Sequence, residues 1–167
     1  MTRIYLPATE ADLAALRDTG SLPVSGAYAV TDELRTELAE NGGTADEELC
    51  EYVAFTSAAY GSLVRIAARP ESAHRRVVVA ADLPDAALRP GGPGLFEVDA
   101  PVPLKAVAAV HVDSDEPEVT RLVDEAVAEL SGGGVAEATA DSLDGHDLEW
   151  YAPSELSDLV DSLRPPA

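Results

Sequence analysis

Three consecutive valines, Val77, Val78 and Val79, are the feature that most constrains how this chain folds. A strand with one face in water alternates apolar and polar side chains, whereas a strand covered on both faces is apolar throughout. The triplet therefore predicts a central strand with a layer packed on each face. The charged segments that flank it, Ser72–Arg76 and Asp82–Asp85, then mark where the chain returns to water.

The chain is long enough to bury a core of its own. Its 167 residues are 46% apolar and 25% charged, which is typical of a globular domain. A chain of this length buries about two thirds of its unfolded surface, so it needs neither a metal nor a disulfide in order to fold. No linker divides it, and we expect one domain over residues 1–163 and a frayed tail over residues 164–167.

Capping residues predict the first helices. Thr9 opens a capping box, and Gly20 ends the helix that follows it. A second box, Thr44 with Glu47, opens the longest helix, which ends before Pro70. The apolar residues that repeat at helical spacing in this longest helix are Leu49, Tyr52, Val53, Tyr60, Leu63 and Ala67.

The same patterns place the other elements. The expected strands lie at 3–6, 26–30, 77–79, 95–98, 103–112, 135–139 and 147–151. Three further helices are expected: one is capped by Thr31, one is capped by Ser114 or Asp115, and one spans 155–163. The glycine-rich segments 89–94 and 131–134 are predicted to be turns. The order of elements predicts a single α/β (α+β) domain, with a mixed β-sheet of about five strands covered by about five helices.

The charge balance limits the partners that the chain can bind. Eleven basic residues face 31 acidic ones, which gives a formal net charge of −20. Nucleic acids and anionic membranes repel such a chain, while cationic partners attract it. The single cysteine, Cys50, excludes an internal disulfide, and no apolar run has the length of a membrane span. We expect a cytoplasmic protein that binds neither nucleic acid nor membrane.

One cationic cluster stands out in this acidic sequence. It comprises Arg65, Arg69, His74, Arg75 and Arg76. Guanidinium groups bind carboxylate or phosphate through two parallel hydrogen bonds, so the cluster is a candidate anion site, with His111 as a candidate acid–base group. Alternatively, these arginines pair with the chain's own carboxylates and with the carboxyl end of the preceding helix.

The remaining candidate sites carry no specific signature. His111 and Asp113 share a strand face, as metal ligands do, but they lead directly into a helix cap. Trp150 and Tyr151 are predicted either to line a binding surface or to place one ring in the core and one at its rim. We predict no catalytic residue, no metal and no cofactor.

Several segments give the chain a likeness to known sequences. It resembles a functionally uncharacterised family of short, acidic actinobacterial proteins, a domain of unknown function. The resemblance implies a single domain of bacterial origin, and it transfers no activity, cofactor or site residue. The segments that carry it are RIYLPAT, AYAVTDELR, RRVVVAADLPD, PVPLKAVAAVHVDS and LEWYAPSEL.

Three functions are consistent with these observations. The leading hypothesis is a non-catalytic cytoplasmic protein that acts through contacts with a protein partner or with further copies of itself. The alternative is a small enzyme or receptor that binds a phosphate- or carboxylate-bearing small molecule through the cluster from Arg65 to Arg76. The third is an acidic mimic of nucleic acid, which requires the carboxylates to gather on one face.

Overall fold

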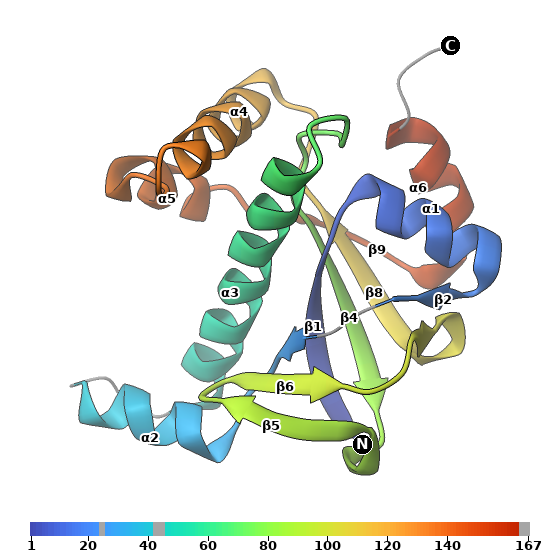
Figure 1. Ribbon diagram of the computed structural model, residues 1–167, viewed down its shortest axis with the longest axis vertical. Helices are drawn as coiled ribbons and strands as arrows, with labels where there is room; N and C mark the ends of the chain where they lie inside the picture. The colour runs from blue at the N-terminus through green and yellow to red at the C-terminus, as the bar shows by residue number, and fades with distance from the viewer. Residues whose placement is uncertain (24–25, 42–45, 164–167) are drawn as a thin grey trace.

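The computed structural model, which describes residues 1–23, 26–41 and 46–163, is built on an antiparallel sheet of seven strands (Figure 1). The strand order is β5-β6-β3-β1-β4-β8-β9. The bounds are Thr2–Ala8 (β1), Gly26–Tyr28 (β3), Val77–Leu83 (β4), Leu88–Gly92 (β5), Leu95–Val98 (β6), Val107–Val112 (β8) and Glu149–Tyr151 (β9). Two short strands, β2 (Ser21–Leu22) and β7 (Val102–Pro103), pair separately. The chain is a single α+β domain.

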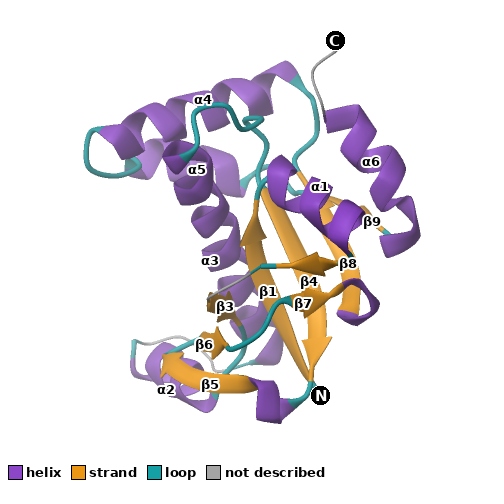
Figure 2. Cartoon of the chain, turned by 45° about the vertical axis from the view of Figure 1, so that its right-hand side comes forward, coloured by secondary structure: helices purple, strands orange, loops and turns teal. Residues whose placement is uncertain are grey.

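Six α-helices accompany the sheet within the described residues (Figure 2). They are Glu10–Thr19 (α1), Asp32–Glu40 (α2), Glu47–Ala68 (α3), Pro117–Ser131 (α4), Glu137–Asp144 (α5) and Leu156–Leu163 (α6). α1 and α6 pack on one face of the central strands and α3 on the other, while α4 packs on α3 and α5 on α4. In the part of the chain described here, no helix is both long and apolar enough to cross a membrane.

The valine triplet lies at the centre of the sheet. β4 has β1 on one side and β8 on the other. Val77 and Val79 belong to the core under α1 and α6, whereas Val78 packs against Ala58 and Ala59 of α3. All three valines are 0% exposed. The prediction of a strand covered on both faces is confirmed.

Two consecutive small residues hold α3 close to the sheet. A Cβ added at Gly61 would lie only 2.9 Å from the Cβ of Pro7, so glycine allows α3 to approach β1. The buried Ser62 hydroxyl donates a hydrogen bond to the Ala8 carbonyl (2.6 Å) and accepts one from the Val77 N–H (2.9 Å). α3 is thereby attached to the adjoining ends of β1 and β4.

The caps predicted for α1 are present. The Thr9 hydroxyl accepts a hydrogen bond from the Asp12 N–H, and the Asp12 carboxylate accepts one from the Thr9 N–H (2.9 Å). Gly20 ends the helix with a φ of 80°, a left-handed conformation that favours glycine. The predicted cap of α2 is also confirmed, because the Thr31 hydroxyl accepts from the Leu34 N–H at 3.1 Å.

The sheet differs from the predicted one in its pairing and in its size. It is antiparallel throughout rather than mixed, and it has seven strands rather than about five. Much of segment 89–94, predicted as turns, instead forms β5, which pairs with β6. Proline is tolerated on an edge strand such as β5, because only one side of the strand bonds to a neighbour.

The prediction of a strand at 135–139 is wrong. Residues from Glu137 onward form α5, because Leu143 packs with Val123 and its neighbours on α4 and this contact favours a helix. The strand predicted at 103–112 is shorter than expected, since a 3₁₀ turn over Leu104–Ala106 precedes β8.

Two helices begin at residues other than the predicted ones. α4 begins at Pro117 with Glu116 as its N-cap, in place of Ser114 or Asp115, because proline suits the first helical turn. The N-cap of α3 is Asp46, whose carboxylate accepts from the Leu49 N–H at 2.7 Å. The predicted cap Thr44 and the predicted tail 164–167 lie outside the described residues.

Candidate functional site

The predicted anion cluster lies where α3 leads into β4, and much of it is engaged by acceptors of the chain itself. Arg65 donates to both carboxylate oxygens of Asp12, at 3.0 and 2.8 Å. His74 Nδ1 lies 2.5 Å from an oxygen of Asp124. The exposed Arg69 side chain has no hydrogen-bond or ion-pair partner in the described residues.

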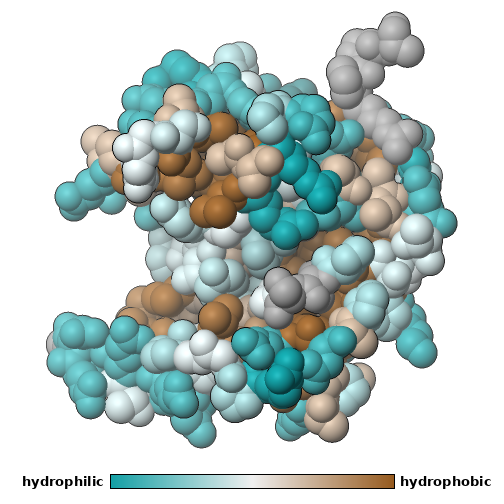
Figure 3. Space-filling view, viewed as in Figure 1, coloured by the Kyte–Doolittle hydropathy of each residue, from teal (hydrophilic) through white to brown (hydrophobic). Residues whose placement is uncertain are grey.

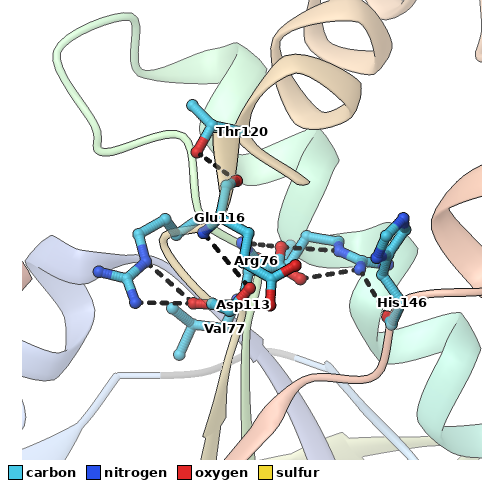
Figure 4. Close-up of polar contacts among 9 residues, drawn as sticks. Arg76, Val77, Asp113, Glu116, Thr120 and His146 are labelled. Carbon is cyan, nitrogen blue, oxygen red and sulfur yellow. Dashed lines mark hydrogen bonds and ion pairs between the residues drawn. The ribbon is translucent and has the colours of Figure 1, made fainter. Parts of the chain in front are cut away.

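Arg76 and Asp113 form a buried ion pair at the same end of the sheet (Figure 4). Arg76 directly precedes β4 and Asp113 directly follows β8, so the two strands bring them together. The Asp113 carboxylate accepts three hydrogen bonds from Arg76, from the backbone N–H (2.8 Å), Nε (2.9 Å) and Nη2 (2.8 Å). The side chains are only 5% and 0% exposed. We call these two residues the Arg76–Asp113 pair.

Further contacts extend the pair to neighbouring segments. Arg76 Nη2 also donates to the His146 carbonyl at 3.2 Å, which connects β4 to the loop after α5. Arg75 donates through Nε (3.0 Å) and Nη2 (2.7 Å) to the Asp113 carbonyl. These donors are therefore directed at acceptors of the protein, and their arrangement fastens β4, β8 and the loop before β9.

The five residues of the predicted anion cluster and His111 do not line a common pocket among the pockets found in the described residues. Arg65 borders a pocket beside Tyr60 and Val64, and Arg76 borders a different one beside His146. The contacts with Asp12, Asp113 and Asp124 follow the alternative interpretation, in which the cationic residues pair within the chain. Anion binding at the exposed Arg69 stays a prediction.

His111 lies on the face of the sheet that α3 covers. Its ring meets that of Phe55 edge to face, with centroids 4.9 Å apart, and Phe55 meets Tyr5 in the same way at 5.7 Å. Burial lowers the pKa of His111, and the positive charge of Arg3 lowers it further. His111 is therefore held neutral within an aromatic row. The described residues contain no group of three His, Cys, Asp or Glu side chains able to hold a metal ion.

Four large apolar side chains are exposed on the α3 side of the molecule. Tyr52, Tyr60 and Val64 follow one another along α3, and Trp150 lies on β9. They are 46–61% exposed, and apart from Met1 they are the exposed large hydrophobic residues of the described chain. We call these four residues the aromatic surface.

Two pockets that share Tyr60 connect the three residues of the aromatic surface that lie on α3. Tyr52 and Tyr60 border a pocket of about 140 Å³ between α3 and α5, and Tyr60 and Val64 border one of about 300 Å³ beside β3 and β6. Figure 3 shows the molecule hollowed between the part with α4 and α5 and the part with α2, β5 and β6, and α3 crosses between these parts (Figure 1).

Trp150 lies on the face of the sheet that α3 covers. It is the strand partner of His111, so both side chains lie on the α3 face, and His111 in turn contacts Phe55. Tyr151 points the other way and packs against the opposite core. One ring was predicted to lie in the core and one at its rim. Tyr151 packs against the core, whereas Trp150 is 61% exposed.

Carboxylates surround the aromatic surface. Asp144 and Asp147 border the pocket between α3 and α5, Glu149 precedes Trp150, and Glu48 and Glu51 flank Tyr52 on α3. All five are exposed, and none forms an ion pair with a described residue. The region is thus apolar and negatively charged at once.

Sequence patterns named Trp150 as a candidate for a binding surface, but they did not identify Tyr52, Tyr60 or Val64. Tyr52 and Tyr60 belong to the predicted apolar stripe of α3, but the helix turns its small residues toward the sheet, among them Ala54, Ala58 and Ala59. The run of alanines and Gly61 was the available signal, since small residues are needed where a helix lies close to a strand. The tyrosines are therefore left on the outer side.

Comparison with known proteins places the chain in a family. No curated protein and no solved structure matches it. A family of unknown function matches over residues 2–160, which includes each of the helices and strands described above except the end of α6. The chain therefore belongs to the family of unknown function DUF6912.

Proposed function

We propose that this protein is a non-catalytic binding protein that recognises a cationic segment of a protein partner on its aromatic surface. The observation that supports the proposal most is that exposed Tyr52 and Tyr60 border one pocket together with the unpaired carboxylates of Asp144 and Asp147. Exposed aromatic residues of this kind are enriched at the centres of protein interfaces.

The chemistry of the surface favours arginine and lysine in the partner. A guanidinium stacks on a tyrosine or tryptophan ring, with a gain of about 0.5–2 kcal/mol. The same group pairs with a carboxylate, and Asp144 and Asp147 stand beside Tyr52 and Tyr60 in one pocket. A segment with alternating cationic and apolar side chains satisfies both kinds of group.

The net charge argues against a second copy of the chain as the partner. Two molecules that each carry a formal charge of −20 repel one another. Burying Asp144, Asp147 and Glu149 against the same residues of another copy adds to this repulsion. A cationic partner removes it, and the attraction also accelerates association.

The cellular setting forms part of the same proposal. We place the protein in the cytoplasm of a bacterium. The free Cys50, which is buried within α3, supports this location because a fold that contains no disulfide in its described residues needs no oxidising compartment.

Selection from a random-peptide display library tests the proposal. The intact protein is immobilised, and recovered peptides are synthesised and titrated by calorimetry into three proteins: wild type, Tyr60→Ala, and Arg121→Ala as a matched control. Arg121 is exposed on α4, outside the aromatic surface. We expect peptides rich in arginine and lysine, with binding weakened about ten-fold by Tyr60→Ala and unchanged by the control.

Two results would overturn the proposal. One is the recovery of peptides without cationic residues, or of peptides that bind Tyr60→Ala as tightly as wild type. The other is a stable dimer in analytical ultracentrifugation that Tyr60→Ala dissociates, because it would assign the surface to contacts between copies.

A further inference from the structure

A second hollow lies at the opposite end of the central strands, away from the Arg76–Asp113 pair. Its volume is about 730 Å³, within the range of small-molecule sites. The buried side chains of Leu83, Val98 and Val107 line it, and Pro84, Pro101 and Pro103 add further apolar surface. Prolines have no N–H, so these positions offer no backbone donors to a polar ligand.

An irregularity in the sheet contributes to this hollow. The β4–β8 pairing shifts by one residue, because Ala80 pairs with Ala109 while Ala81 pairs with Val107. Ala108 is left without a partner strand residue and lines the cavity. Such bulges bend a strand and are common beside binding sites.

Lys105 is the cation that this cavity offers to a ligand. It is the only lysine of the sequence, and it lies on the short turn before β8. No carboxylate of the described residues lies within ion-pair distance of it, although acidic residues outnumber basic ones 31 to 11. Its ammonium group is therefore available.

The carboxylates at the cavity are already neutralised. Asp82 pairs with Arg3 at 2.7 Å, and Asp99 pairs with Arg89 at 2.5 Å. Consequently, neither of them competes strongly for Lys105. The N-terminal ammonium group of Met1, which also borders the cavity, lies 3.9 Å from a carboxylate oxygen of Asp85. Lys105 is therefore the cation at the border of this apolar surface that has no carboxylate partner among the described residues.

We infer that this cavity binds a small carboxylic acid with an apolar body, whose carboxylate pairs with Lys105. The apolar lining takes the hydrocarbon part, and a single lysine balances a single negative charge. A dianion such as a phosphate monoester fits less well, because a second charge would face apolar side chains within a protein of net charge −20. This site is separate from the aromatic surface, so the inference does not depend on the proposed function.

Titration of ¹⁵N-labelled full-length protein with octanoate tests the inference, with 1-octanol as an uncharged ligand of the same length. The variants are Lys105→Met, which removes the charge, Lys105→Arg, which keeps it, and Arg69→Met as a control. Arg69 is the matched control because its side chain is also an exposed cation without a carboxylate partner, at a different place in the fold.

We expect octanoate to shift the amide signals of residues that line the cavity, among them Leu83, Val98 and Ala108. Lys105→Met should weaken binding about ten-fold, while Lys105→Arg and Arg69→Met should change it less than about two-fold. 1-Octanol should bind wild type about ten-fold more weakly than octanoate does. The inference is overturned if Lys105→Met binds octanoate as tightly as wild type, if the shifted amides lie elsewhere, or if about 1 mM octanoate shifts none.

Discussion

Removal of either partner of the Arg76–Asp113 pair should destabilise the protein more than removal of both. Asp113→Asn keeps the shape of the side chain but leaves the Arg76 guanidinium, only 5% exposed, without a counter-charge. The side-chain amide that this variant introduces also points its hydrogens at those of the guanidinium group, so the two groups repel each other. Arg76→Met keeps the aliphatic stem and leaves the fully buried Asp113 carboxylate with one of its three hydrogen bonds to Arg76, that from the backbone N–H.

The magnitude follows from the burial of the two charges. An unpaired charge in such a site costs about 3–5 kcal/mol, so each single variant should lower the free energy of unfolding by that amount. The double variant has no buried charge, and the amide oxygen introduced at position 113 still accepts the backbone N–H of residue 76, so its loss should be less than about 2 kcal/mol. The two effects are therefore expected to be non-additive by several kcal/mol.

Urea unfolding, followed by far-UV circular dichroism, gives the free energy of unfolding of wild type, the two single variants and the double variant. The dependence of this free energy on urea concentration should be the same in all four proteins. Since a domain of this kind has a total stability of about 5–15 kcal/mol, each single variant should show a clearly lower midpoint. If the single variants lose less than about 1 kcal/mol, or if their losses add in the double variant, the argument that the pair fastens β4 to β8 is refuted.

Three further predictions concern other parts of the fold. Because the pKa of His111 is lowered in the folded chain, the unfolded chain binds a proton at a higher pH than the folded chain does. The free energy of unfolding should therefore fall as the pH drops below 6.5. His111→Phe keeps the contact with Phe55 and should show a smaller fall over the same pH range, as urea titrations at several pH values would reveal. Gly61→Val must move α3 away from Pro7 and should cost about 1–3 kcal/mol in chemical denaturation. Thr9→Ala removes the cap of α1 and should cost about 1 kcal/mol, seen as a lower thermal midpoint.

Specific outcomes would contradict each of these. An equal pH dependence in wild type and His111→Phe would show that His111 is not held neutral by its surroundings. A Gly61→Val variant as stable as wild type would show that α3 has room to approach β1 with a larger side chain. An unchanged midpoint in Thr9→Ala would place the stabilisation of α1 in its packing rather than in its cap.

Local chemistry in the sequence predicted the centre of the fold well. The triplet from Val77 to Val79 is buried on both faces, and the caps Thr9 and Thr31 lie at the starts of their helices. These features depend on neighbouring residues and on side-chain polarity, which sequence patterns record directly.

Features that depend on distant contacts were predicted poorly. Segment 135–139 has the composition of a strand, yet contacts with α4 make α5 of most of it and of the residues that follow. Strand β5 contains Pro90 and two glycines, and it forms because β6 pairs with it at the sheet edge. Neither partner is visible in a local window of sequence.

The candidate site shows the same division. The residues from Arg65 to Arg76 were recognisable as a cluster, but their partners Asp12, Asp113 and Asp124 are distant in sequence. The exposure of Tyr52, Tyr60 and Trp150 depends on which side of α3 and β9 faces the sheet. Lys105 is visible in the sequence as the single lysine, but its position at a cavity and its lack of a carboxylate partner among the described residues depend on the fold.

We propose that partners bind on the aromatic surface, whereas the arginine cluster stabilises the fold. The most direct measurement is a map of amide signals in ¹⁵N-labelled protein as a selected cationic peptide is added. We expect the largest shifts along α3 from Tyr52 to Val64 and around Trp150, and no shift of the Arg76 and Asp113 amide signals. The largest shifts over α1 and α6, or over the segment from Arg69 to Arg75, would contradict this proposal.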